Sequence, residues 1–406
     1  MELTPIFQTA IGLDIHQRQI TACAITTDRD GQVCVEHREF GTFKRDRRAL
    51  AKWCAARVPG VVVMESTGIY WKSPYAALEQ VGIRALVVNA RHVKNVPGRK
   101  TDIADAQWLA TLARSGLLRG SFIPPETLRN LRLVARQRHK LNRMLTAEKN
   151  RTHKVLADGG VRLSTVVSDL HGQSARAMVQ ALVDGQSPEQ VIALASRRLK
   201  APRADLLAAL DGELSDDHRF VLAQLLEHVQ QLEARIRAFD ARLLAGLEDH
   251  RDILKLLQTL PGVDRIGAAM LLVEIGTEME AFGSPDRLAS WVGICPGNNE
   301  SAGKRKSGRI RQGNPHVRRL LCEFAHAARR TRCGLQSKYH SLAARRGNKR
   351  AIVALAHKML RIIYFMIERR DYYRDSDVNY EAMMVERNAP RWIRMLNQYG
   401  YLSPST

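Results

Sequence analysis

The sequence contains no uncharged stretch near the roughly 18 apolar residues that a membrane span needs. Its N-terminus lacks both the basic segment and the long apolar segment of an export signal. It also has no C-x-x-C pair, although several of its six cysteines sit in apolar strand or helix patterns. We therefore expect buried, reduced thiols and a cytoplasmic protein that does not enter a membrane. The cysteines are Cys23, Cys34, Cys54, Cys295, Cys322 and Cys333.

Acidic residues are few, because 41 Asp and Glu stand against 63 Lys and Arg, a formal net charge of +22. The composition is still that of a globular protein. A chain of 406 residues that is 45% hydrophobic can bury a full core, in about two or three domains. Such a charge attracts a polyanion, and without a membrane segment nucleic acid is favoured over lipid.

The first 115 residues alternate between strand-like and helix-like patterns. Three short strands come first, and Asp30-Gly31 predicts a tight turn between the second and the third. Helices and apolar strands alternate after them. The resulting order, βββαβαβα, is that of the ribonuclease H fold. The expected strands are 9–15, 19–26, 32–36, 61–65 and 84–89, and the expected helices are 47–57, 73–81 and 101–115.

Two long helices are predicted in the middle of the chain. Pro124-Pro125 ends the first pattern, and residues 126–157 then form one long basic helical pattern. From Leu222 onward, apolar residues recur in steps of three and four over about three heptads. This second helix either packs only on its own chain or forms an antiparallel coiled coil with helix 126–157 that also joins protomers. The heptad positions are Leu225, Val229, Leu232, Ile236, Phe239 and Leu243, and the cations of helix 126–157 are Arg129, Arg132, Arg136, Arg138, Lys140 and Arg143.

A third region starts near residue 251 with an apolar helix, a Pro261-Gly262-Val263 turn and a second apolar helix. This order matches a helix-hairpin-helix, whose turn amides around Gly262 can hold a nucleic-acid phosphate without reading sequence. Residues 301–350 then hold fifteen Lys or Arg and a single acid, Glu323. A charge run is usually a solvated face, but this imbalance favours a polyanion surface.

These patterns predict an α/β domain followed by helical regions. We expect an α/β domain over residues 1–125, a helical coiled-coil region over 126–250, a helical carboxy-terminal domain over 251–380 and a tail over 381–406. The apolar helical pattern of 351–372 indicates that the basic stretch before it belongs to a folded domain.

Four acids stand where elements of the first domain end or begin. Asp14 and Glu65 end apolar strands, and Asp102 and Asp105 lie one helical turn apart. Carboxylates placed this way can converge on a divalent metal at one edge of a sheet, as in a nuclease site. Each has a structural alternative, since Asp14 could end its strand beside His16, and the aspartate pair could cap a helix. Glu65 fits that alternative least, because a carboxylate after four apolar strand residues is costly unless paired or metal-bound.

A second candidate group surrounds Ser301, which lies in a polar, glycine-containing segment followed by cations. A hydroxyl on a mobile loop among cations is a plausible nucleophile toward phosphorus, because the cations stabilise charge on the phosphoryl oxygens. Serines in such loops are usually turn residues, and spacing alone does not choose Ser301 over Ser307. The cations that follow are Lys304, Arg305, Lys306 and Arg309.

Several motifs of this sequence resemble one family, the DEDD-type insertion-sequence transposases, which are related to the Piv DNA invertases and described as bridge-RNA-guided recombinases. The resemblance covers nearly the whole chain. Its motifs are Gly12-Leu13-Asp14-Ile15-His16, Glu65-Ser66-Thr67-Gly68-Ile69-Tyr70, Lys100-Thr101-Asp102-Ile103-Ala104-Asp105-Ala106, Leu260-Pro261-Gly262-Val263, Asn299-Glu300-Ser301-Ala302-Gly303 and Gly313-Asn314-Pro315-His316-Val317-Arg318-Arg319-Leu320.

The resemblance implies a RuvC-like ribonuclease H domain whose four acids bind Mg²⁺, and a carboxy-terminal transposase domain with Ser301 as nucleophile. It implies strand exchange through a 5′-phosphoserine link, a noncoding guide RNA that pairs with donor and target DNA, and a homo-oligomer, dimer or tetramer, in a bacterial nucleoid-associated setting. The acids and the serine would come from different protomers. One departure is Ala302, where relatives can have glycine directly after the serine. The residues expected to bind nucleic acid are Lys304, Arg305, Lys306, Arg309, Arg311, Arg318, Arg319 and Gly262.

Two other functions fit the same residues. The chain could be a RuvC-like, metal-dependent, structure-selective endonuclease that hydrolyses DNA directly with the four acids and leaves Ser301 idle. It could also be a non-enzymatic nucleic-acid-binding protein in which the acids only cap helices and pair with cations. A covalent protein–DNA adduct distinguishes the recombinase from the endonuclease, and binding without cleavage would favour the third function.

Overall fold

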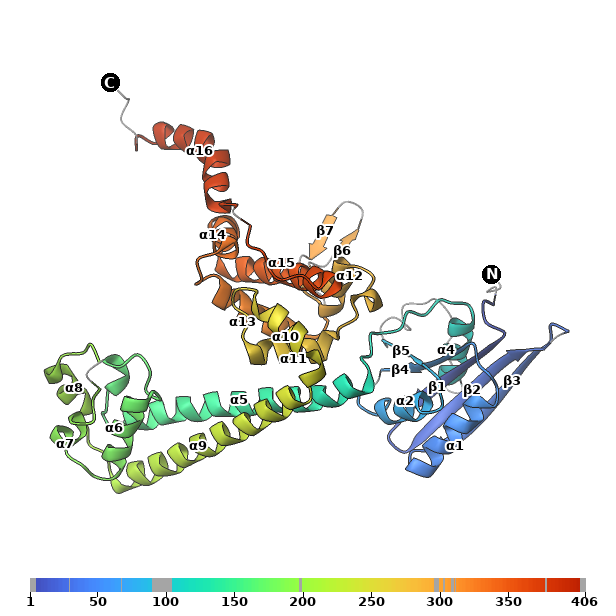
Figure 1. Ribbon diagram of the computed structural model, residues 1–406, viewed down its shortest axis with the longest axis horizontal. Coiled ribbons are helices and arrows are strands. Elements are labelled where there is room, and N and C mark those ends of the chain that lie inside the picture. The colour runs from blue at the N-terminus through green and yellow to red at the C-terminus, as the bar shows by residue number, and fades with distance from the viewer. Residues whose placement is uncertain are drawn as a thin grey trace. The chain divides into compact units, whose positions relative to one another are not determined.

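A computed structural model describes residues 5–28, 30–66, 68–89, 104–196, 199–295, 299–301, 304–307, 310, 312–376 and 378–401. For 299–301 and 304–307 it describes the backbone. The chain divides into two compact units, residues 1–126 and 127–406, and each is described by itself (Figure 1). The finer division of the second unit expected from the sequence stays a prediction.

The first unit is built on a five-stranded sheet with the strand order β3-β2-β1-β4-β5. β1 is antiparallel to β2 and parallel to β4, and β5 is parallel to β4. The expected order βββαβαβα is confirmed. β3 runs further than expected, because it pairs with β2 along its whole length up to Gln19↔Gly41. The elements are β1 (Thr9–Ile15), β2 (Gln19–Thr27), β3 (Val33–Gly41), α1 (Lys44–Ala55), β4 (Val61–Glu65), α2 (Lys72–Glu79), β5 (Leu86–Val88) and α4 (Ala104–Arg114).

Helices cover both faces of this sheet because its central strands are apolar on both faces. Alternate side chains of a strand point to opposite faces. Ile11 and Leu13 of β1 share a core with residues of α1 and α2, whereas Ala10 of β1 and Val63 of β4 share a second core with Leu109 of α4. The near-continuous apolar run of β4 therefore reflects burial on two sides.

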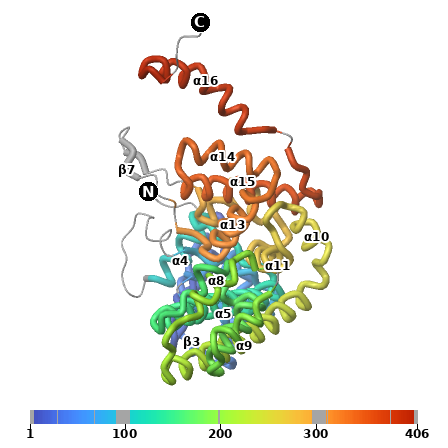
Figure 2. The backbone as a smooth tube through the Cα atoms, turned by 90° about the vertical axis from the view of Figure 1, so that its left-hand side faces the viewer, coloured from blue at the N-terminus to red at the C-terminus, as the bar shows by residue number. Residues whose placement is uncertain are grey.

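In its described residues the second unit has helices and one two-stranded hairpin. Figure 2 shows α13, α14 and α15 side by side. Its helices are α5 (Glu126–Asp158), α6 (Gln173–Val183), α7 (Pro188–Ile192), α8 (Arg203–Leu210), α9 (Asp216–Ala245), α10 (Arg251–Gln258), α11 (Arg265–Ile275), α12 (Pro285–Val292), α13 (Pro315–Ala328), α14 (Gly334–Arg346), α15 (Asn348–Arg369) and α16 (Tyr380–Gln398), with short 3₁₀ turns at Leu163–Thr165, Glu248–His250 and Met279–Ala281. The hairpin strands are β6 (Asn299–Ser301) and β7 (Lys304–Ser307).

The long helices α5 and α9 run antiparallel along one another. Leu141 of α5 packs with Leu232 and Ile236 of α9. Further along α5, Glu148 meets His228 at 3.3 Å, so residue numbers fall on α9 as they rise on α5. The apolar stripe of α9 therefore packs on its own chain. A role of these helices in joining protomers stays a prediction.

The buried stripe of α9 differs by one position from the expected seam. Leu225 is half-buried, whereas its neighbours Leu222 and Leu226 are buried in a core with α6 and with the end of α5. At this end α9 packs against several helices instead of one. A heptad pattern assumes a single partner helix, and for this reason it predicted Leu225 as the buried residue in place of Leu226.

We expect Leu232→Ala to lower the free energy of unfolding by about 2–5 kcal/mol, because it leaves a cavity under a fully covered side chain. Leu232 is 1% exposed. Urea denaturation followed by circular dichroism measures the loss. Leu225→Ala is the matched control and should cost clearly less. Equal losses at the two positions would contradict the packing of α9 described above.

Two other expectations meet the structure differently. The expected tail contains α16, whose residues are all exposed or half-buried and whose first turn is capped by the Asn379 side chain. No disulfide links the six cysteines, all within the described residues, and Cys23 and Cys54 are buried as expected. Cys34, in contrast, is exposed, because it lies on the edge strand β3. In the described part of the chain no helix is long and apolar enough to span a membrane.

Candidate active site

Asp14 and Glu65 lie next to each other at the ends of parallel strands. β1 pairs with β4 in the register Gly12↔Val63 and Leu13↔Met64, so the next residue of each strand falls at the same level. Gly12 and Val63 face α4, and the period of two along a strand turns the two acids to that same face. Both acids are half-buried. The sheet thus brings together two of the four predicted carboxylates.

Asp105 is brought to the same face by the close packing of α4 on β1. It lies in the first turn of α4 and is half-buried. A Cβ atom at Gly12 would lie 2.0 Å from the Ala106 carbonyl oxygen and 2.6 Å from the Ala110 backbone nitrogen, so only glycine permits this approach. The first turn of α4 therefore meets β1 just before Asp14. Asp102 lies outside the described residues.

The ion pair of Asp14 adds little to the stability of the fold. Asp14 Oδ2 lies 3.0 Å from His16 Nε2, but the His16 side chain is 70% exposed, so this pair contributes little to stability. Within the described residues, no three His, Cys, Asp or Glu side chains stand close enough to hold a metal ion. Three carboxylates on one face of the sheet supply the oxygen donors that Mg²⁺ prefers, and the fourth predicted acid is outside this set.

Ser301 is the last residue of β6, directly before the connection to β7. It pairs with Lys304, and Glu300 pairs with Arg305, in an antiparallel register with an irregularity between Asn299 and Glu300. The sequence predicted a loop around the serine, and the structure has a strand of a hairpin there. The physical reason is that antiparallel strands can be joined by as few as two residues. The register sets Ser301 opposite the first cation of the basic stretch.

Comparisons with known proteins match the two segments of the chain in which these groups of residues lie. A family model of DEDD transposases of IS110, described as "Transposase", matches residues 11–159, which contain all four acids. A second model, described as "Transposase IS116/IS110/IS902 family", matches residues 254–341, which contain Ser301. Together the two models cover more than half of the chain. The chain belongs to this family of transposases.

Curated relatives extend this likeness over most of the chain. A probable family 20 transposase of Pseudomonas aeruginosa is 26% identical over 324 residues, 78% of this chain and 86% of its own length. The transposase for insertion sequence element IS1111A of Coxiella burnetii is 25% identical over 374 residues, 90% of this chain and 91% of its own length. Among solved structures, RuvC of Thermus thermophilus aligns with 28% of this chain and 99% of its own, at 13% identity and a TM-score of 0.22.

Several residues that the sequence predicts to bind DNA or RNA fall outside what can be described. Arg309 and Arg311 lie outside the described residues, and for Lys304, Arg305 and Lys306 only the backbone in β7 is described. Arg318 and Arg319 are half-buried in the first turns of α13. A transposase acts on DNA, and the part that each of these cations plays in holding it stays a prediction.

Gly262 has a packing reason to be glycine. It lies between α10 and α11 with a φ of 89°, a conformation that side chains disfavour. A Cβ atom there would lie 2.4 Å from the Phe324 carbonyl oxygen and 2.7 Å from the Ala328 nitrogen, both in α13. The turn is thus covered on this side by α13. Its expected role as a phosphate-binding helix-hairpin-helix stays a prediction.

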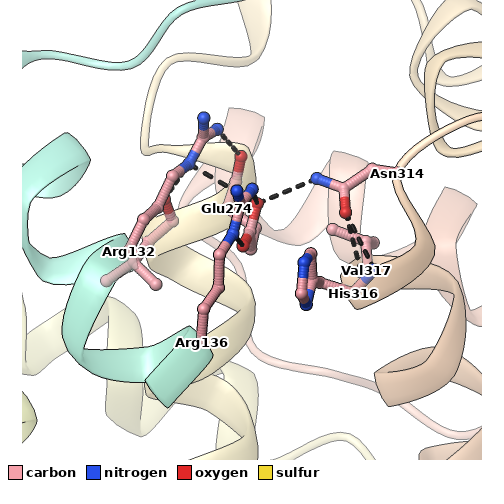
Figure 3. Close-up of polar contacts among 7 residues, drawn as sticks. Arg132, Arg136, Glu274, Asn314, His316 and Val317 are labelled. Atoms are coloured by element: carbon pink, nitrogen blue, oxygen red, sulfur yellow. Dashed lines mark hydrogen bonds and ion pairs between the residues drawn. The ribbon is translucent and has the colours of Figure 1, made fainter. Parts of the chain in front are cut away.

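Three arginines of α5 are held by carboxylates of the second unit (Figure 3 shows two of them). Arg136 forms a bidentate ion pair with Glu274 of α11, in which Nε donates to Oε1 at 2.8 Å and Nη2 donates to Oε2 at 2.9 Å. Arg132 lies 3.5 Å from the same carboxylate. Arg138 pairs with Asp240 of α9 at 2.7 Å. These three arginines hold helices together. Only the other cations of α5 are therefore left for the polyanion-binding face that the sequence predicts.

The Glu274 carboxylate and its arginine partners remain charged at neutral pH. Burial raises the pKa of Glu274, but the hydrogen bond from Arg136 and the charges of Arg132 and Arg136 outweigh burial and hold it below its usual range. Burial lowers the pKa of Arg132 to about 10, still far above neutrality. Beside them, burial and then the charge of Arg319 lower the pKa of His139 to about 4. His139 is therefore neutral in a small recess that it lines with Glu274 and Arg319.

Sequence reasoning missed Glu274 and its partner Asn314, although a signal was present. Glu274 follows a run of apolar and small residues in α11 and is 2% exposed. A buried carboxylate is unstable without a cation or several hydrogen bonds, so an acid within an apolar helix calls for a search for partners. The Gly12 contact with α4 was missed as well. Its signal was a glycine inside a strand, which often marks a close backbone approach.

Proposed function

We propose that this transposase is a DNA recombinase that cuts and exchanges strands with a DEDD carboxylate group and a serine nucleophile. The observation that best supports this proposal is that Asp14 and Glu65 lie side by side at the ends of parallel strands, with Asp105 on the same face of the sheet. Single acids at strand ends are commonly structural. Asp14, Glu65 and Asp105 on one face of a transposase domain support a shared ligand, although no three described acids stand close enough to hold a metal ion without Asp102 or a small movement.

Asp14, Glu65, Asp102 and Asp105 would hold Mg²⁺. Carboxylate oxygens suit this ion, and its binding would supply activation of the attacking oxygen and neutralisation of charge on the leaving oxygen. Asp14 and Glu65 are fixed by the sheet, whereas Asp105 depends on the packing of α4 on Gly12. Rigid strand ends are well suited to hold two ligands at a constant separation.

Ser301 is the proposed nucleophile. Its Oγ would lose its proton and attack a DNA phosphorus, the bond from that phosphorus to the 3′ oxygen would break, and a 5′-phosphoserine link and a free 3′ hydroxyl would result. Attack by a 3′ hydroxyl on that link would rejoin strands and release the serine. A hydroxyl is a poor nucleophile at neutral pH, so cations such as Lys304, Arg305 or Arg309 would stabilise the phosphoryl charge.

Guidance by RNA and assembly into a homo-oligomer are further parts of the proposal. A noncoding RNA from the same element would pair with donor and target DNA, and the acids and Ser301 of different protomers would compose one active centre. The two groups lie in different units of the chain, which leaves room for such an arrangement. The RNA is tested by sequencing the DNA that flanks the gene. A structured transcript with segments matching the element ends supports guidance, and its absence argues against it.

The rival function is direct hydrolysis by a structure-selective endonuclease. It is favoured by one observation, that the three described candidate acids, Asp14, Glu65 and Asp105, all lie in the first unit. A suicide DNA substrate incubated with protein and Mg²⁺ separates the two. A protein–DNA adduct that survives denaturation supports the recombinase. Cleaved ends without an adduct support the endonuclease, and metal-independent binding without cleavage supports a non-enzymatic binder.

We expect DNA affinity to depend steeply on salt, falling by orders of magnitude between about 50 and 200 mM, because each neutralised phosphate releases counterions. The turn between α14 and α15 belongs to the basic stretch 301–350 that we propose to bind DNA. It carries four exposed cations, and no acid lies among them in the sequence. Arg345→Gln with Arg346→Gln should reduce the slope of log affinity against log salt by about one for each phosphate that is no longer neutralised. The four are Arg345, Arg346, Lys349 and Arg350.

The matched control removes the same charge from another exposed place. Arg235→Gln with Arg237→Gln on α9 alters two exposed arginines outside the basic stretch and should leave the slope unchanged. Fluorescence anisotropy with labelled duplex DNA at several salt concentrations gives both slopes. An affinity that hardly changes with salt in the unmodified protein would show that the basic stretch is only a solvated face.

A further inference from the structure

The segment that bears Ser301 leaves and re-enters the helical core at one point. It runs from the end of α12 to the start of α13. A Cβ atom at Gly313 would lie 2.4 Å from the Gly293 nitrogen, so the two ends touch backbone to backbone. The Asn314 backbone N–H also donates to the Trp291 carbonyl oxygen at 3.2 Å. The two ends of the segment therefore meet at Gly293 and Gly313, and we call this meeting point, with Asn314 beside it, the base of the hairpin.

The Asn314 side chain makes two kinds of contact at this base (Figure 3). Its Oδ1 accepts hydrogen bonds from the backbone N–H groups of His316 at 3.0 Å and Val317 at 3.3 Å, and so caps α13. Its Nδ2 donates to Glu274 Oε2 at 2.8 Å. The amides need an acceptor and the carboxylate needs a donor, so only one orientation of the amide group satisfies both.

Glu274 is a rigid anchor for this contact. Its side chain is 2% exposed, and the paired prongs of Arg136 and the nearby Arg132 fix both carboxylate oxygens. Bidentate pairs between arginine and carboxylate are strong and directional. Asn314 therefore ties the base of the hairpin to α11 and, through the arginines, to the long helix α5.

We propose that Asn314 is a positioning residue, which holds the serine-bearing hairpin in register with the helical core through its hydrogen bond to Glu274. This inference rests on the proposed role of Ser301 as nucleophile. A cap alone does not require asparagine, because aspartate caps helices equally well. Aspartate has no donor for Glu274, and the buried carboxylate would meet a second negative charge. Capping of α13 therefore explains the Oδ1 atom of Asn314 but not its Nδ2 atom, which the bond to Glu274 explains.

The test is Asn314→Asp, which keeps the cap and removes the tether. We expect the single-turnover rate of Ser301–DNA adduct formation to fall about tenfold or more, since a hydrogen bond to a charged group is removed and the nucleophile is displaced. DNA affinity should stay within about twofold, because every cation that neutralises a phosphate is still present. Asn379→Asp is the matched control, the same substitution at the cap of α16, and should leave the adduct rate unchanged.

Exchange of donor and acceptor supplies the rescue. In the double variant Asn314→Asp with Glu274→Gln, the amide and the carboxylate trade places, so the hydrogen bond between positions 274 and 314 can form again and the net charge of the pair is preserved. The bond from Arg136 Nη2 to Oε2 is lost in the double variant and in Glu274→Gln alone, so the comparison of the two cancels that loss. We expect the double variant to form the adduct faster than Asn314→Asp alone, and faster than the product of the two single effects predicts. Thermal denaturation of each variant gives its melting temperature, and all rates are measured well below the lowest of them.

An unchanged adduct rate in Asn314→Asp overturns the proposal, as does a double variant that is no faster than the product of the two single effects predicts. A loss of rate that comes with an equal loss of DNA affinity assigns Asn314 a merely structural role and overturns it too. The parent hypothesis is tested separately with Ser301→Ala. If that variant still exchanges strands, the serine assignment fails, whereas an inactive Ser301→Ala with an unimpaired Asn314→Asp leaves the serine in place and removes only the tether.

Discussion

Replacing Ser301 with alanine should abolish both strand exchange and the covalent protein–DNA link. The loss should reach at least about 10⁴-fold, as expected when the group that attacks is removed from a covalent mechanism. Ser301 ends β6, so alanine fits its backbone and the hairpin should persist. A suicide substrate with a nick near the cleavage site measures the adduct, and mass spectrometry of the digested adduct identifies the modified residue.

Ser307→Ala is the matched control for this experiment. Ser307 ends β7 of the same hairpin and pairs with Asn299, and sequence spacing alone could not separate it from Ser301. It should retain adduct formation near the rate of the unmodified protein. Full strand exchange by Ser301→Ala, or an adduct on another residue, would remove the serine assignment and make direct hydrolysis the better account.

Replacing Asp14 or Glu65 with alanine should eliminate recombination while DNA binding is largely retained. Loss of a ligand from a metal site should exceed the about 100-fold effect of disturbing its outer shell. The proposed binding surface is cationic, so removing a carboxylate should not weaken it. Glu39→Ala is the control, because Glu39 is an exposed carboxylate on the edge strand β3 of the same sheet. Strand exchange is assayed with and without Mg²⁺.

Recombination by Asp14→Ala or Glu65→Ala at near the normal rate in Mg²⁺ would mean that these acids only end strands. The same variants test how the active centre is composed. Mixing the Ser301→Ala and Asp14→Ala proteins should restore some activity if acids and serine from different subunits meet. Restored activity would support composition between protomers. A mixture as inactive as its parts would favour a centre within one subunit.

The sequence by itself determined the elements of the first unit and the places of its acids. Alternating and apolar runs of strands are local patterns, and β1 and β4 occur within the predicted bounds. Parallel pairing of β1 with β4 then follows from the order of elements, since β2, β3 and α1 lie between them and α1 brings the chain back across the sheet. Asp14 and Glu65 come directly after such runs, so their common edge could be predicted without coordinates.

Only the tertiary structure decided which charges serve the fold. Arg136 and Arg143 look alike in the sequence of α5, but Arg136 pairs with Glu274, more than a hundred residues away, while Arg143 is exposed. The same holds for Leu225 and Leu226, because the stripe of α9 that is buried depends on which helices surround it. Periodicity shows that one face of a helix is apolar or basic. It does not show which distant group arrives at that face, and burial is set by that group.

The serine hairpin illustrates both sides of this division. The basic residues around Ser301 are visible in the sequence, and their charge alone predicts a phosphate-binding chemistry. Two other features are not visible in the sequence, because each joins separate elements. They are the close contact between Gly293 and Gly313 and the hydrogen bond from Asn314 to Glu274. Charge and periodicity are properties of neighbours along the chain, whereas a tether between α11 and α13 forms only once the packed helices have brought the half-buried Asn314 donor and the buried Glu274 acceptor together.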